Sequence, residues 1–269
     1  MQTPASPGQT RQVRIAGTDI ELWESGAGRP LLLLHPGDGF DPRAPYVAAL
    51  AAGYRVIAPS APGFGGSGNP PAWLKSVDDL SYVYLDLLEA LDLQDLVVVG
   101  FSFGGWLAAE IAVKNTSRMA ALCLVDTVGA KFSDPMTRDI TDLFSIPLYQ
   151  HPQWIYHDEK RRCPNLRELP DEEAVVLARN HQTFGLLGWS PTLHSRRLQH
   201  RLHRIDVPTQ LVWGAQDRIV GVDYGRRWQQ AIPGAQLAVI EEAGHYPQVE
   251  QPERFVEALD RFVKPIAAR

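Results

Sequence analysis

One five-residue stretch, Gly100-Phe101-Ser102-Phe103-Gly104, constrains the fold of this chain more than any other. It follows the apolar run Leu96–Val99 and precedes a helix-compatible segment that extends to Thr116. This order predicts a strand, a sharp turn and a helix. A turn this tight strains its central residue and leaves room only for small residues two positions before and two after it. The two glycines occupy those positions.

Such a turn would present Ser102 as a nucleophile. Its hydroxyl would stand clear of the strand end, and the Phe103 N–H would lie at a helix N-terminus, where a developing negative charge is stabilised. Gly-x-Ser-x-Gly alone also occurs in ordinary glycine-rich loops, but the flanking strand and helix favour the catalytic interpretation. The rest of the chain must then supply a base, an orienting acid and a second donor to the oxyanion.

The remaining pattern indicates one α/β domain with an insertion. The 269 residues are 45% hydrophobic, which suffices for a large core. Strand and helix signals alternate up to residue 130 and again from residue 201, whereas residues 131–200 contain short, proline-broken, aromatic-rich segments. We predict a catalytic core formed by residues 1–130 and 201–269, built on a mostly parallel sheet flanked by helices, and a small, mainly helical lid at residues 131–200.

Periodicity places the individual elements. Alternating residues on either side of Gly17-Thr18-Asp19 predict a hairpin of antiparallel edge strands, and Ser76 with Asp79 resembles a helix capping box. The expected strands are Gln12–Ile15, Ile20–Trp23, Leu31–Leu34, Tyr54–Pro59, Met119–Val125, Gln210–Trp213 and Gln236–Ile240. The expected helices include Tyr46–Ala52, a segment with an apolar face from Leu80 to Leu91, and Pro252–Val263.

Charge and cysteine content exclude several classes of partner. The net charge is -5 and the only basic cluster runs from Arg196 to Arg204, so we expect no nucleic-acid partner. Of the two cysteines, Cys123 is expected in the core and Cys163 at the surface, without a disulfide framework. The segment Met1–Arg11 lacks a signal-peptide core and no run reaches membrane-spanning length, so we expect a soluble cytoplasmic protein without a membrane partner.

The chain order Ser102, Asp217, His245, with a loop at His35 upstream, resembles the α/β-hydrolase fold family. The resemblance covers nearly the whole chain outside the lid. It implies that Ser102 is the nucleophile, His245 the general base and Asp217 the acid that holds the imidazole, with no metal or organic cofactor. The chemistry agrees, because a serine hydroxyl needs an imidazole to take its proton and the imidazolium needs a carboxylate on its other nitrogen.

Two assignments have alternatives. His245 is one of eight histidines, but it lies on a short loop with Gly244 after an expected strand, whereas most of the others fall in or beside the lid. His35 is expected to brace its own loop. Asp217 is favoured as the acid because it ends a Gly-x-x-Asp turn after a strand; the rival is Asp126, which ends another strand and otherwise would cap a turn at the lid entry.

The oxyanion loop departs from the family's usual His-Gly start. Pro36 follows His35 and has no N–H, so the second donor beside Phe103 is expected to be Gly37, with Asp38 as the alternative; the stretch is also compatible with a plain turn. A carboxylate at Asp38 would raise the barrier to oxyanion formation unless it points away or is paired.

The lid aromatics predict the character of the pocket. Trp154, Phe184, Leu187 and Trp189 are expected to form an apolar substrate pocket with Asp38 at its edge, suited to small or medium uncharged esters. The leading hypothesis is therefore a carboxylic ester hydrolase, a serine esterase that works through an acyl-enzyme. Lactones, activated amides and polyester fragments are alternative substrates, and a receptor-like binding protein with this fold is an alternative of another class.

The nearest alternative is a serine hydrolase that cleaves a carbon–carbon bond of ring-fission products. Such relatives tend to carry a tryptophan directly after the histidine and a lid arginine for the substrate carboxylate. Here Tyr246 takes the first place, and Arg161, Arg196 and Arg197 are the arginines available for the second. Ser102 argues against the epoxide hydrolase and haloalkane dehalogenase branches, which use an aspartate nucleophile.

Overall fold

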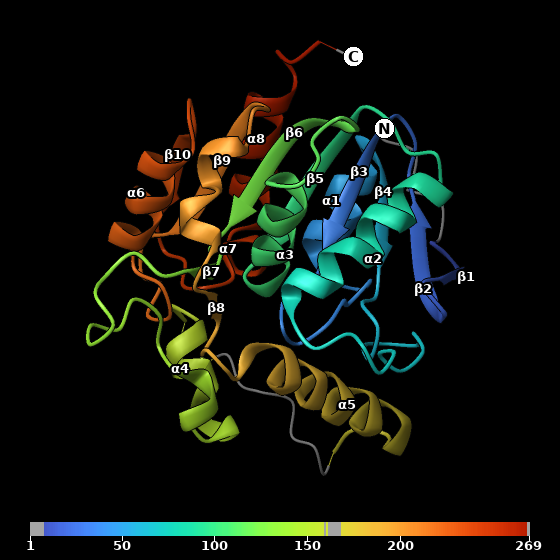
Figure 1. Cartoon of the computed structure of the whole chain (residues 1–269), viewed down its shortest axis with the longest axis horizontal. Helices are drawn as coiled ribbons and strands as arrows, with labels where there is room; N and C mark the ends of the chain where they lie inside the picture. The colour runs from blue at the N-terminus through green and yellow to red at the C-terminus, as the bar shows by residue number, and fades with distance from the viewer. Residues whose placement is uncertain (1–7, 159, 161–167, 268–269) are drawn as a thin grey trace.

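The computed structural model describes residues 8–158, 160 and 168–267, so Arg161 and Cys163 lie outside the described residues. Among the described residues, eight strands form one sheet in the order β1-β2-β4-β3-β5-β6-β9-β10 (Figure 1). Their bounds are β1 Gln9–Ile15, β2 Thr18–Ser25, β3 Arg29–Leu34, β4 Tyr54–Pro59, β5 Leu96–Phe101, β6 Met119–Val125, β9 Thr209–Gly214 and β10 Gln236–Ile240. The predicted α/β class with a mostly parallel sheet is confirmed.

The predicted hairpin is present with one correction. β1 and β2 pair antiparallel from Gln9–Glu24 to Ile15–Thr18, but β2 also pairs antiparallel with β4, so of the two hairpin strands β1 alone lies at an edge of the sheet. From β4 to β10 the neighbouring strands are parallel.

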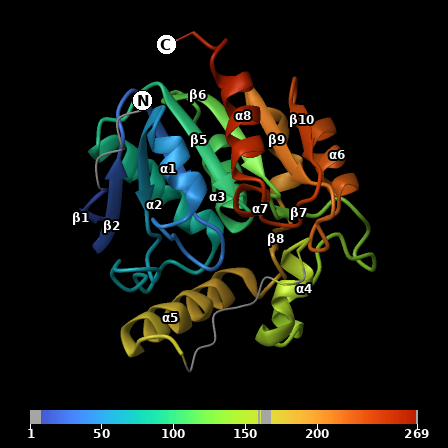
Figure 2. The ribbon, with the colours of Figure 1, turned by 180° about the vertical axis from the view of Figure 1, so that it is seen from behind.

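Helices cover both faces of the sheet, as Figures 1 and 2 show. Leu31 and Leu33 of β3 belong to the core cluster shared with α1 (Pro45–Ala51) and α8 (Pro252–Val263). Leu32 and Leu34 belong to the cluster shared with α2 (Val77–Ala90), α3 (Phe103–Ala112) and α6 (Val222–Ala231). This double cover explains why the central strands read as unbroken apolar runs. The Cys123 side chain is buried in this core, as predicted.

Residues 131–193 leave the sheet between two short paired strands, β7 (Gly129–Ala130) and β8 (His194–Ser195). The segment holds 3-10 turns at Leu143–Ser145 and Leu148–Gln150, helix α4 at His151–Ile155 and helix α5 at Asp171–Gly188. Figures 1 and 2 both place α4 and α5 beyond one end of the sheet.

The short, proline-broken segments expected from the sequence do not describe α5, which runs without a break. The helix has 18 residues, starts directly after Pro170 and carries Asp171, Glu172 and Glu173 in its first turn. Proline just before a helix and acidic residues in the first turn both stabilise its N-terminus. Both signals are visible in the sequence.

The remaining described elements complete the core. They are the 3-10 turns Leu198–His200 and Leu202–Arg204 and the short helix α7, Pro247–Glu250. Within the described part of the chain, the helices all fall short of the length and apolar character that crossing a membrane requires.

Candidate active site

The sharp turn after β5 has the predicted strained geometry. Ser102 has φ 50° and ψ -109°, in a region that L-residues rarely adopt. A Cβ atom on Gly100 would lie 2.4 Å from the Gly104 carbonyl oxygen, and a Cβ atom on Gly104 would lie 2.1 Å from the Leu34 oxygen. Both positions therefore require glycine, and the turn holds Ser102 between β5 and α3.

The structure brings the three predicted side chains Ser102, His245 and Asp217 together. His245 Nε2 lies 2.8 Å from Ser102 Oγ, and His245 Nδ1 lies 2.8 Å from Asp217 Oδ2. Both contacts are satisfied when Nδ1 carries the hydrogen, donates it to the carboxylate, and Nε2 accepts from the hydroxyl. All three residues are buried. The arrangement can move a proton from Ser102 to the imidazole while Asp217 balances the charge.

Two loops at the carboxyl ends of β9 and β10 fix His245 against Asp217. A Cβ atom on Gly214 would lie 1.9 Å from the Gly244 oxygen, so the loops approach at a distance that only glycine allows. Asp217 Oδ1 accepts the N–H groups of Ile219 at 2.7 Å and Val220 at 3.1 Å. These bonds orient the carboxylate before the imidazole binds it.

The last turn of α4 reaches the same site. The His245 N–H donates to the Ile155 oxygen at 2.6 Å. The Glu250 carboxylate accepts the Gly244 N–H at 2.7 Å and the His157 N–H at 3.1 Å. The histidine loop is therefore attached to the α4–α5 segment as well as to the sheet.

Asp126, the rival acid, lies beside Asp217, at the bend between β6 and β7. It is fully buried, and its carboxyl interacts with that of Asp217 and accepts the Gly214 N–H at 3.0 Å. Burial first, and then the charge of Asp217, raise the pKa of Asp126 well above its ordinary value. His245 hydrogen-bonds Asp217, as favoured from the sequence.

His35 braces the oxyanion loop, as expected. Its Nδ1–H donates to the Pro36 oxygen at 2.7 Å, and its Nε2 accepts the Ala61 N–H at 3.0 Å. Burial lowers the pKa of His35 to about 4, so the ring is neutral at pH 7. The N–H groups of the predicted donors, Gly37 and Phe103, have no hydrogen-bond acceptor among the described residues, so both stand free for a ligand.

Asp38 is paired. Its Oδ1 lies 3.3 Å from His181 Nε2, and its Oδ2 accepts the Tyr246 hydroxyl at 2.8 Å. Burial raises the pKa of Asp38, but the contacts with His181 and Tyr246 outweigh it and leave the pKa below its ordinary value. The pairing satisfies the condition under which a carboxylate is tolerated near an oxyanion. Sequence reasoning assigned no role to either partner, although Tyr246 directly follows His245.

The predicted pocket residues differ in how far each is buried. Phe184 packs edge-on against Phe103 at 5.6 Å between ring centroids, and a Cβ atom on Gly37 would approach its ring to 2.9 Å. Leu187, one turn further along α5, is buried. Trp189 is 62% exposed and contacts the Phe144 ring, so the structure does not support it as a lining residue. Trp154 is half-buried against the core.

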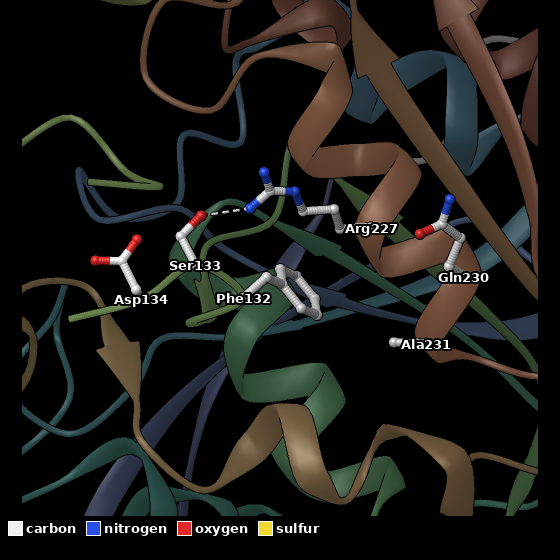
Figure 3. Close-up of a pocket in the computed structure, with 6 residues that line it drawn as sticks. All are labelled: Phe132, Ser133, Asp134, Arg227, Gln230 and Ala231. Carbon is white, nitrogen blue, oxygen red and sulfur yellow. Dashed lines mark hydrogen bonds between the residues drawn. The ribbon is translucent and has the colours of Figure 1, made fainter. Parts of the chain in front are cut away.

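A separate hollow opens beside α6 (Figure 3). Its volume is about 510 Å³, and Phe132, Ser133, Asp134, Arg227, Gln230 and Ala231 line it. The Arg227 guanidinium donates to Ser133 Oγ at 2.5 Å and forms an ion pair with Asp139. The hollow contains no residue of the Ser102 site.

The sequence profile of the α/β-hydrolase fold family matches residues 30–252. The chain belongs to this family. It is 28% identical over 276 residues to a 2-hydroxymuconate semialdehyde hydrolase from Pseudomonas putida, covering 96% of this chain and 95% of the relative. It is 27% identical over 277 residues to a 2-hydroxy-6-oxo-2,4-heptadienoate hydrolase, also from Pseudomonas putida, covering 94% of this chain and 95% of the relative.

A solved structure shares the fold over nearly the same length. The serine hydrolase involved in carbazole degradation, the CarC enzyme, superposes with a TM-score of 0.78 at 21% identity, covering 96% of this chain and all of that one (100%). As a member of the α/β-hydrolase family, this protein is a hydrolase, and its site lies where family members carry theirs, at the carboxyl ends of the parallel strands.

Proposed function

We propose that this hydrolase cleaves a carbon–carbon bond in a ring-fission product, with Ser102 as nucleophile, His245 as general base and Asp217 as the acid. The observation that carries the proposal is the relay from Ser102 through His245 to Asp217, with 2.8 Å at each contact. The two Pseudomonas relatives suggest the choice of bond, because both match almost the whole chain and are named as hydrolases of 2-hydroxymuconate semialdehyde and of 2-hydroxy-6-oxo-2,4-heptadienoate. This reverses the order of the two hypotheses from the sequence.

In the proposed mechanism, each residue of the site has one role. His245 Nε2 takes the Ser102 proton as Oγ attacks the ketone carbon, and the N–H groups of Phe103 and Gly37 receive the oxyanion. The enol of the dienoate first passes to its keto tautomer, in which the enol proton has moved to the carbon beside the scissile bond. When the carbon–carbon bond then breaks, that carbon keeps the electron pair, which conjugation through the remaining double bond to the new carbonyl stabilises, and takes the proton from His245. Water then adds to the acyl-enzyme with His245 as base, which releases the acid and restores Ser102.

Ester hydrolysis by the same residues is the second candidate, and the surroundings of Asp38 favour it. A dienoate carries a carboxylate, which the Asp38 carboxylate would repel if the two came close. Arg179 of α5 is engaged elsewhere, because its guanidinium donates to the carbonyl oxygens of Gly65 and Ser67. Arg196 and Arg197 are exposed. An uncharged ester under Phe184 would need no cation.

A direct comparison of substrates tests the proposal. We expect purified protein to consume 2-hydroxy-6-oxo-2,4-heptadienoate, followed by loss of its absorbance, with a higher kcat/KM than for p-nitrophenyl esters from acetate to octanoate. The Ser102→Ala variant gives the background for each substrate. A higher kcat/KM for the esters would make the protein an esterase, and a single turnover without steady hydrolysis of either class would favour a receptor-like protein.

A further inference from the structure

Two buried carboxyl groups lie against each other behind His245, although a catalytic relay needs only one acid. An oxygen of Asp126, an oxygen of Asp217 and a ring nitrogen of His245 all lie within 4.8 Å of one another. The side chains of Asp126 and Asp217 are both closed to solvent. Burial and a like charge this close both disfavour a second ionised carboxyl, and this favours a pair that shares one proton.

The hydrogen-bond donors around the pair decide which carboxyl is charged. Asp217 accepts three hydrogens, from the N–H groups of Ile219 and Val220 and from His245 Nδ1. Asp126 accepts one, because the Gly214 N–H is shared between its oxygens at 3.0 and 3.3 Å. Donors stabilise the ionised form, so the negative charge belongs on Asp217.

A proton on Asp126 can fill the last free hydrogen-bond acceptor position of the Asp217 carboxylate. An ionised carboxylate has about four acceptor positions, and the three donors leave one for the Asp126 hydroxyl. The other charged group that faces Asp126 is the Glu250 carboxylate of α7, which further disfavours a negative charge on Asp126. Burial, Asp217 and Glu250 therefore favour the neutral form of Asp126, whereas the Gly214 N–H and the imidazolium that His245 forms during the relay oppose it.

We propose that Asp126 is a neutral positioning residue that donates a hydrogen bond to Asp217 and so fixes Asp217 as the charged partner of His245. The inference rests on the proposed serine hydrolase function, but not on the identity of the substrate. Among the described residues the Asp126 carboxyl has no hydrogen bond to Ser102, so its effect on the reaction passes through Asp217. The high pKa of its carboxyl agrees with this role.

The test follows how fast a fluorophosphonate modifies Ser102 as a function of pH. Asp126→Leu removes the donor, so Asp217 is less well oriented and holds the imidazolium more strongly. We expect the rate constant at pH 7 to fall about tenfold. We also expect the acid limb of the plot of rate constant against pH to move about one pH unit upwards. Asp126→Asn keeps a donor for Asp217 and an acceptor for the Gly214 N–H. Its rate constant and the position of its acid limb should therefore lie close to those of the unmodified protein.

The inference is overturned if Asp126→Asn reacts as slowly as Asp126→Leu, or if the Asp126→Leu profile matches the unmodified protein.

A second measurement does not depend on the fold of Asp126→Leu. In the ¹³C spectrum of protein labelled at its aspartate carboxyl groups, one protonated carboxyl is expected at pH 7, lost in Asp126→Asn and kept in Asp223→Asn, which changes an exposed carboxylate. A spectrum at pH 7 that contains only signals of ionised carboxyl groups would refute the inference.

These outcomes are separate from the proposed function. If the dienoate is not cleaved but the phosphonate profiles shift as expected, the choice of substrate is wrong and the role of Asp126 stands. If the dienoate is cleaved and the profiles do not shift, the proposed function stands and Asp126 only fills space.

Discussion

Ser102 occupies a strained backbone position that alanine can share, because the φ of 50° is imposed by the surrounding turn and not by the hydroxyl. We expect Ser102→Ala to fold normally and to lose about a million-fold in kcat. Steady-state assays with the preferred substrate measure the loss, and near-ultraviolet circular dichroism checks the fold. Residual turnover within tenfold of the unmodified protein would remove Ser102 from the role of nucleophile.

Asp217 is the carboxylate bonded to His245, so its amide variant should be far more damaging than that of Asp126. We expect Asp217→Asn to lower kcat by about 10⁴-fold, since the amide favours the wrong tautomer of His245. Asp126→Asn is the matched comparison, because it changes the neighbouring carboxyl in the same way. The opposite ranking in folded variants would move the acid to the end of β6.

His35 makes stability depend on pH. Its folded pKa of about 4 lies below the value of 6.5 for a free histidine, so the unfolded chain binds the proton first as the pH falls. The contribution of His35 is complete above pH 6.5 and is lost as the pH falls towards 4, by about 3 kcal/mol in total. Urea unfolding gives the free energy of unfolding at each pH for the unmodified protein and for His35→Gln. The slopes of the two curves of this free energy against pH should differ only in this window. Parallel stability curves would contradict the expectation.

Helix α5 connects the outer segment to the loops of the site. Asn180 Nδ2 donates to the backbone carbonyl oxygen of Asp38 at 2.8 Å, and Asn180 Oδ1 accepts the Gly65 N–H at 2.9 Å. Thr183 Oγ1 donates to the Gly63 oxygen at 3.0 Å. Because Phe184 follows directly, these bonds set how far its ring stands above Gly37 and Phe103. These polar contacts of α5 therefore fix the position of Phe184 against Gly37 and Phe103.

Phe184 should therefore control which acyl groups fit. We expect Phe184→Leu to move the optimum towards longer p-nitrophenyl ester chains, at about 0.8 kcal/mol per methylene accommodated. Leu186→Ala is the control, because Leu186 lies on the same helix but is 68% exposed. The kcat/KM series across chain lengths measures the shift. An unchanged optimum in Phe184→Leu, or an equal shift in Leu186→Ala, would show that Phe184 does not line the pocket.

Much of the molecule follows from local sequence patterns. The apolar runs predicted β3, β5 and β6, and the glycines around Ser102 predicted the turn, because each signal lies within a few neighbouring residues. The pairing of Ser102, His245 and Asp217 was predicted from their chain order in the family. The boundaries of the lid at residues 131 and 200 stay a prediction.

The remaining contacts join residues that are far apart in the chain. Asp38, His181 and Tyr246 meet only because α5 crosses the loop after β3, and neither register nor composition encodes that crossing. The Asp126–Asp217 pair arises because β6 and β9 are neighbours in the sheet, so two strand-end carboxyls that looked like rivals act at the same place. Trp189, directly after α5, is exposed, and its exposure could not be predicted because it depends on how the preceding helix packs.

The most direct test of this account is to identify the residue that a fluorophosphonate modifies. After brief labelling at pH 7, peptide mass spectrometry should find one adduct, on Ser102, in the peptide that contains Gly100 and Gly104. His245→Gln should slow the labelling by several orders of magnitude, because the base that activates the hydroxyl is lost. An adduct on another serine, or labelling of Ser102→Ala at the rate of the unmodified protein, would contradict the account.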